Sequence, residues 1–251
     1  MITRILWAMA SIAVGFALVA VWQLAADLQL ISPVFFPGPD RAWAALVAGL
    51  QSGELGPNIA ATVERMFYGW FVASVAAVAL GALIGVSAAA RLYLGPTLEF
   101  IRPLPASAIV PLTIALVGLS DAMVLIVITF GAVWPILLAT VHGFAAVEPR
   151  LYEVSRALRL SRWKVITKIA LPSAMPDILA GMRIGLTVSL ILTVVGEMLA
   201  SRDGLGMWIL LAARSFRSAD LFSGVILLGL IGYASAQILA VVERRLLRWR
   251  V

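Results

Sequence analysis

Long apolar stretches separated by short polar segments dominate the pattern of this chain. Four stretches contain no Asp, Glu, Lys or Arg: 5–26, 66–90, 122–147 and 221–242. Two more, 101–119 and 178–200, are apolar but interrupted by charged residues or prolines. A helix needs about 20 apolar residues to cross the hydrocarbon core of a bilayer. We therefore predict an all-α membrane protein with about six transmembrane helices.

The composition supports a chain embedded in the lipid bilayer. Of the 251 residues, 62% are hydrophobic and 13% are charged, and the mean hydropathy is +1.03. A soluble domain of this size could not bury that much apolar surface. The first apolar run is longer than the core of a cleaved signal peptide, which favours a retained helix. The formal charge of +6 does not indicate nucleic-acid binding, because the basic residues lie between apolar segments.

Lysine and arginine are distributed unequally between the two predicted sides. The richer side holds Arg4, Arg91, Arg102, Arg150, Arg156, Arg159, Arg162, Lys164, Lys168, Arg244, Arg245, Arg248 and Arg250. The other side holds Arg41, Arg65, Arg202, Arg214 and Arg217. Since cytoplasmic loops carry the excess of Lys and Arg, we expect both termini in the cytoplasm. No linker divides the chain, so 1–251 is predicted to be a single transmembrane domain.

The predicted outer connection, 27–65, is long and contains its own short helix. Prolines at its centre indicate extended chain followed by a turn. Asp40 is then positioned to cap a helix over 41–50. Its apolar residues Trp43, Leu46, Val47 and Leu50 would fall on one face. We expect this helix to lie along the outer membrane surface or to pack on the spans.

The segment 148–172, between the fourth and fifth spans, is basic and amphipathic. Pro149 suits the first turn of a helix, and Leu151, Val154 and Leu158 then repeat as an apolar stripe. Ser161 is expected to cap a second helix, over 162–171. These two short helices would form a bent projection on the cytoplasmic side.

The end of this projection is also predicted from its prolines. Pro172 and Pro176 are expected to end the second helix before the fifth span begins, with Asp177 near the N-cap of that span. Two interpretations of the loop remain open. It is either a solvated basic loop that contacts anionic lipid headgroups or a docking arm. The stripe and Trp163 argue for a partner surface, but amphipathic surface helices are common too, so the residues alone leave the two interpretations evenly matched.

The same segment resembles the EAA loop of binding-protein-dependent ABC importers. Glu153, Ile169, Leu171 and Pro172 match that pattern in type and order. Two positions depart from it. Val154 and Ser155 replace Ala-Ala, and Arg159 stands where a glycine is expected. An arginine disfavours the positive φ that a glycine would permit, which leaves a break at Leu160-Ser161 as the alternative.

The resemblance extends from about residue 33 to 245. Over this range the chain is similar to the permease group that includes nitrate, sulfonate and taurine importers. Matching motifs include 102–105, 111–112, 180–185, Glu197 and 204–206. It implies a type I ABC importer permease fold with two cytoplasmic coupling helices, in a bacterial inner membrane. It also implies a second copy of the permease in a homodimer, two ABC ATPase subunits and an extracytoplasmic substrate-binding protein. Residues implied to contact the ATPase are Leu151, Glu153, Val154, Ala157, Leu158, Arg159, Ser161 and Trp163.

The sequence offers little for catalysis within this chain. No phosphate-binding loop precedes either lysine, so ATP hydrolysis is expected in a partner subunit. Nucleophile-elbow and metal-ligand patterns are absent from the sequence, and cysteine is missing. The single histidine, His142, lies in an apolar span, where a structural role is favoured. We therefore expect no catalytic residue, no metal and no cofactor.

Several interrupted positions are candidates for a transport pathway or gate: Pro103, Pro105, Pro111, Arg183 and Glu197. Prolines break the third predicted span, and the freed backbone groups need a wet or protein-lined environment. Arg183 and Glu197 lie too far apart on one helix to pair with each other, and a structural role is favoured for both. The leading hypothesis is an importer permease for a small solute such as a sulfonate or nitrate. A self-sufficient secondary transporter is the alternative, and an intramembrane enzyme is a third class.

Overall fold

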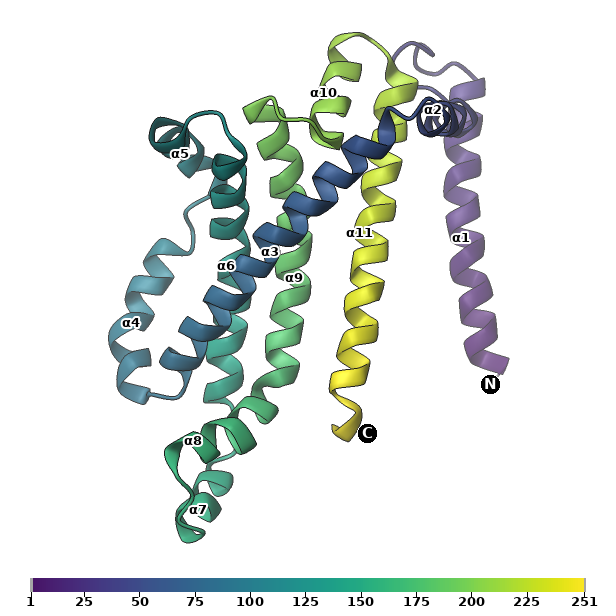
Figure 1. The fold of residues 1–251 in the computed structure, drawn as a ribbon. Coiled ribbons are helices and arrows are strands. Elements are labelled where there is room, and N and C mark those ends of the chain that lie inside the picture. The colour runs from purple at the N-terminus through teal and green to yellow at the C-terminus, as the bar shows by residue number, and fades with distance from the viewer. Residues whose placement is uncertain (1, 251) are drawn as a thin grey trace. The chain divides into compact units, whose positions relative to one another are not determined.

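The computed structural model describes residues 2–250, and these form helices joined by short turns, without a strand (Figure 1). Within this range, five helical segments are long and apolar enough to span a membrane. They are α1 (Ile2–Asp27), α3 (Leu55–Gly85), α6 (Asp121–Ala145), the continuous segment Arg162–Ala200 and α11 (Ser218–Leu246). A bent helix pair supplies a sixth. The predicted all-α membrane fold is confirmed.

The third predicted span is broken where its prolines cluster. Helix α4 (Ala88–Ile101) is followed by the 3-10 turn η1 (Ala106–Ile109) and by α5 (Val110–Val117), with a bend of 79°. The predicted break is therefore confirmed, but the predicted start at residue 101 is wrong. The side chain of Ser87 accepts a hydrogen bond from the Ala90 N–H at 3.2 Å, so the helix begins well before that residue.

One compact unit contains residues 1–60 and 203–230. In it, α2 (Pro39–Gln51) confirms the predicted amphipathic helix. Its buried residues are Ala42, Leu46 and Gly49, whereas Trp43 and Leu50 are exposed. The predicted Asp40 cap is wrong: Gly38 is the N-cap, and no side chain caps the helix. Helix α10 (Leu205–Arg214) also belongs to this unit.

The second compact unit contains residues 61–202 and 231–251 and is built around α6 and the segment that ends in α9 (Leu171–Ala200). Glycines bring these two helices close together. A Cβ at Gly181 would lie 2.6 Å from the Ala139 Cβ, and one at Gly185 would lie 2.7 Å from the Ile136 Cδ1. Such close approach lets backbones pack tightly where no hydrophobic effect drives helices together in lipid.

The fifth span does not begin after a break. Helix α8 (Arg162–Val165) continues through a π-helical turn, η2 (Ile166–Ala170), directly into α9. The expected termination at Pro172 and Pro176 is wrong, because Pro172 lies in the first turn of α9 and Pro176 lies inside it. Asp177 is correspondingly not an N-cap. The Leu171 N–H bonds to the Ile166 carbonyl, and we attribute this wider turn to the Pro172 ring, which would clash with the carbonyl four residues earlier.

Candidate functional site

Helices α7 (Pro149–Ala157) and α8 form an arm beyond the ends of α6 and α9 (Figure 1). Pro149 occupies the first turn of α7, as predicted. The Ser161 side chain accepts a hydrogen bond from the Lys164 N–H at 3.4 Å, so its predicted role as a cap is also confirmed. The arm is therefore fixed at both helix starts by residues that the sequence identifies.

The bend between the two helices lies at the position where the family pattern has glycine. Arg159 has a φ of 49°, so the alternative of a break at Leu160-Ser161 is wrong. The Leu160 N–H donates to the Ser155 carbonyl at 2.9 Å, and the Arg159 N–H donates to the Arg156 carbonyl at 3.0 Å. These two bonds form a Schellman motif, which satisfies the last carbonyls of α7. Arg159 thus adopts the left-handed conformation without the freedom of a glycine.

The arm has one packed face and one exposed apolar face. Tyr152 packs on a cluster that contains Phe144, Val147 and Ala170, and Ser155 beside it is buried. On the opposite side, the exposed fractions are 53% for Val154 and 65% for Leu158.

Other residues on the arm are exposed as well. Trp163 on α8 is 74% exposed. Leu151, Glu153, Ala157, Arg159 and Ser161 also lie at the surface. All of the predicted ATPase-contact residues are therefore accessible on one small projection.

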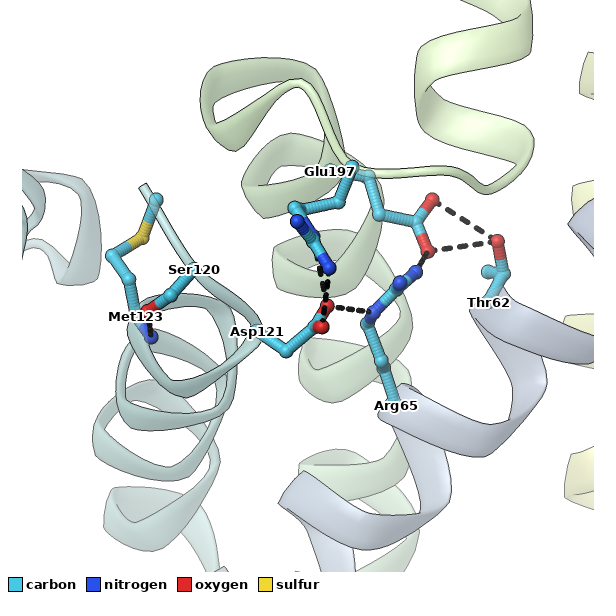
Figure 2. A network of polar contacts seen from close by, with 7 residues as sticks. Thr62, Arg65, Ser120, Asp121, Met123 and Glu197 are labelled. Atoms are coloured by element: carbon cyan, nitrogen blue, oxygen red, sulfur yellow. Dashed lines mark hydrogen bonds and ion pairs between the residues drawn. The ribbon is translucent and has the colours of Figure 1, made fainter. Parts of the chain in front are cut away.

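A cluster of charged side chains around the buried Glu197 ties three helices together within the second unit (Figure 2). Glu197 of α9 is fully buried and accepts a hydrogen bond from the Thr62 hydroxyl at 2.9 Å. The Arg65 guanidinium of α3 lies 3.0 Å from Glu197 and 2.9 Å from Asp121, the first residue of α6. Arg202 also pairs with Asp121, at 2.6 Å. We call these five residues the charge cluster.

Sequence reasoning identified Glu197 but missed its partners. Arg65 and Asp121 lie immediately outside the predicted spans, where charges at a helix end are ordinary. These charges and Glu197 all lie near span ends on the same predicted side. That coincidence is the signal from which the cluster could have been predicted. A carboxylate within a span needs a cation at the same depth.

The remaining pathway candidates are not brought together at one site. Arg183 of α9 forms an ion pair with Glu243 of α11. Pro103 and Pro105 lie exposed in the break between α4 and η1, and Pro111 lies in the first turn of α5. Among residues 2–250, no group of His, Cys, Asp or Glu has an arrangement that could hold a metal ion.

Comparison with known proteins identifies the class to which this fold belongs. Residues 73–248 match the family of binding-protein-dependent transport system inner membrane components, so the chain belongs to that family. The fold is that of a type I ABC importer permease. It is similar to the structure of the methionine ABC transporter MetNI in inward-facing conformations, with a TM-score of 0.58 and 22% identity over 72% of this chain and 92% of that chain. An amino acid ABC transporter with histidines gives a TM-score of 0.62 and 16% identity over 80% of this chain and 98% of that chain.

Relatives in sequence point to one group within the family. A Bacillus subtilis permease whose name assigns it to aliphatic sulfonate transport is 30% identical, over 93% of this chain and 84% of that protein. The taurine transport system permease of Escherichia coli is 29% identical, over 92% and 86%. The nitrate import permease of Leptolyngbya laminosa is 30% identical, over 86% and 80%. The chain is thus a multi-pass ABC importer permease of this group, a class that is not itself catalytic and that works with an ATPase and a substrate-binding protein.

Proposed function

We propose that this chain forms the translocation pathway for a small organic or inorganic anion, such as a sulfonate, taurine or nitrate, and that its arm couples the pathway to an ATPase. The names of the sulfonate, taurine and nitrate relatives support the substrate class. The missing phosphate-binding loop supports ATP hydrolysis in a separate subunit. Two such subunits would serve two copies of this permease, and both termini would face the cytoplasm.

One observation carries the coupling proposal: the arm is rigidly capped, yet it leaves Val154, Leu158 and Trp163 exposed. A basic surface loop in water gains nothing from exposing these side chains. A groove on an ATPase would cover them, in the way that an amphipathic helix lays its apolar face into a partner. Docking would move the spans only if it differs in free energy between inward- and outward-facing states.

The gating residues are proposed with narrower roles. Pro103, Pro105 and Pro111 would shape a pathway wall, because they bend the third span by 79°. Glu197 and Arg183 would hold helices in register through their ion pairs rather than contact the solute.

Coupling is tested by reconstituting the permease with its ATPase and binding protein in vesicles. Leu158→Glu is expected to abolish solute-stimulated ATP hydrolysis and uptake while membrane insertion persists, since a carboxylate cannot enter an apolar groove. Glu153→Arg should act in the same direction. Arg150→Glu is the control, because Arg150 is 86% exposed on the same helix but outside the apolar stripe. Normal coupling in Leu158→Glu would contradict the docking role. Screening sulfonates, taurine and nitrate in the same vesicles tests the substrate class.

A further inference from the structure

The inner side of the arm borders a half-open cavity that the coupling role does not use. Its volume is about 640 Å³, which lies in the size range of small-molecule sites. Val86, Ser87 and Ala88 line one wall, and Tyr152, Arg156 and Arg162 line another. The remaining wall comes from α8 and η2, through Val165, Ile166 and Ala170. All of these residues belong to the second unit.

The side chains that line the cavity carry positive charge, and no acidic side chain among the described residues of the lining neutralises it. Arg156 and Arg162 face it, and none of the described residues that line it is acidic. Arg91 adds a third guanidinium close to Tyr152. Its contact with the Gly85 carbonyl uses only part of a group that carries five N–H donors. Arg156 and Arg162 therefore line a space where an anion with several oxygens would be held, and Arg91 adds positive charge near Tyr152.

Tyr152 adds a neutral donor to this site. Burial raises the pKa of its phenol, and the charge of Arg91 opposes that shift only in part. The hydroxyl is consequently protonated at neutral pH and is able to donate a hydrogen bond.

The cavity also lies where two of the candidate membrane spans end. Val86, Ser87 and Ala88 directly follow the end of α3 at Gly85, and Val165 and Ile166 lead into α9. Both spans therefore meet the membrane surface at this level. The lining combines apolar side chains with two guanidinium groups, which match the two parts of a phospholipid. A soluble phosphate would use only the second part.

We propose that this cavity binds the phosphate headgroup of an anionic phospholipid at the base of the arm. Basic pockets between membrane helices on the cytoplasmic side hold such headgroups in general. The lipid and the ATPase would not compete, because Arg156 and Tyr152 lie on the side of α7 away from Leu158 and Val154. The two interpretations of the basic loop would then both apply, one to each face.

The test measures lipid retained by the purified full-length permease after exchange into a mixture of phosphatidylglycerol and phosphatidylcholine. Native mass spectrometry counts the bound molecules. The wild type is expected to retain phosphatidylglycerol preferentially. In Arg156→Gln combined with Arg162→Gln, that retention should fall roughly 30-fold, since each arginine near the surface contributes about five-fold. The control, Arg150→Gln combined with Lys164→Gln, removes the same charge from the same arm outside the cavity and should retain the lipid.

A second variant tests the cavity without changing its charge. Ala88→Phe should fill the space and lower phosphatidylglycerol retention while all three arginines remain. It also keeps the proposal testable if the double glutamine variant fails to fold. Equal lipid retention by wild type and Ala88→Phe would overturn the proposal.

Two further outcomes would assign the site to other ligands. Displacement of phosphatidylglycerol by excess inorganic phosphate would identify a free-anion site and overturn the lipid proposal. Loss of ATPase co-purification in the double glutamine variant, with lipid retention unchanged, would also overturn it, because the arginines would then serve the protein contact. Failure of the coupling experiment alone leaves lipid retention unaffected, so the two proposals are tested separately.

Discussion

At the scale of single residues, four non-glycine residues among 2–250 adopt positive φ: Gln29, Arg159, Ser201 and Phe216. Each lies just beyond the end of a helix. The left-handed conformation costs a residue with a Cβ roughly 1–2 kcal/mol. The hydrogen bonds of the helix end therefore outweigh side-chain preference at these positions. This is why the arginine at the glycine position of the EAA loop does not move the bend.

Replacing Arg159 by glycine should stabilise the permease. Arg159→Gly removes the Cβ that opposes a φ of 49°, so we expect the free energy of unfolding to rise by about 1 kcal/mol. Thermal unfolding in detergent measures the change. The matched control, Arg156→Gly, places glycine inside α7 and should destabilise by roughly 0.5–1 kcal/mol. A lower unfolding midpoint for Arg159→Gly would contradict this account.

The charge cluster makes a second prediction at this scale. Arg65→Met removes the guanidinium 3.0 Å from Glu197, a carboxylate with no solvent exposure. Leaving a buried charge without its partner typically costs about 3–5 kcal/mol. Thermal unfolding should show this loss, and Arg65→Met combined with Glu197→Gln should recover part of it. In the exposed pair of Arg150 and Glu148, Arg150→Met is expected to change stability by less than about 1 kcal/mol. Equal effects of the two single variants would refute the role of burial.

At the scale of helices, proline acts differently from what its sequence position alone indicates. Pro103 and Pro105 interrupt a span, as expected, because each lies outside regular helix. Pro172 and Pro176 do not: a π turn precedes Pro172, which lies in the first turn of α9, and Pro176 lies inside that helix. Helix α9 continues through both prolines and packs tightly against α6 through Gly181 and Gly185. Such packing partners are far apart in sequence, so the local pattern cannot predict them.

The π turn should set the rotation of the arm. In Pro172→Ala the steric reason for the wider turn disappears, and a regular α-helix would rotate the arm by about 100°, the angle of one residue. We expect reduced uptake and a changed distance between spin labels at positions 92 and 158. Pro176→Ala is the control, because Pro176 lies in regular α-helix. An unchanged label distance in Pro172→Ala would show that another feature maintains the turn.

At the scale of the whole molecule, the membrane spans and the all-α membrane class could be predicted, because the length of each apolar run can be counted in the sequence. The five unbroken spans and the broken third span follow from runs of about 20 residues and from prolines. Partners of buried charges could not be predicted in the same way. Three helices must pack before Arg65, Asp121 and Glu197 become neighbours. The periodicity of residues within one helix does not predict such contacts between helices.

Membrane orientation remains a prediction that the arginine distribution supports. The chain has no cysteine, so single cysteines can be introduced without removing native ones. A membrane-impermeant maleimide should label Trp163→Cys only in inverted vesicles and Glu54→Cys only in right-side-out vesicles. The reverse pattern would place the arm outside the cell and would also refute the coupling proposal.

The charge cluster has a consequence for the passage of an anionic solute. The formal charges of Arg65 and Arg202 cancel those of Asp121 and Glu197, which lie within hydrogen-bonding distance. Four such charges act as a multipole, whose field decays much faster with distance than that of a lone cation. A sulfonate or nitrate passing at a distance would therefore experience almost no electrostatic pull from these four groups. For the anion proposed as solute, this electroneutrality would avoid a strongly attractive cationic site that slows its release.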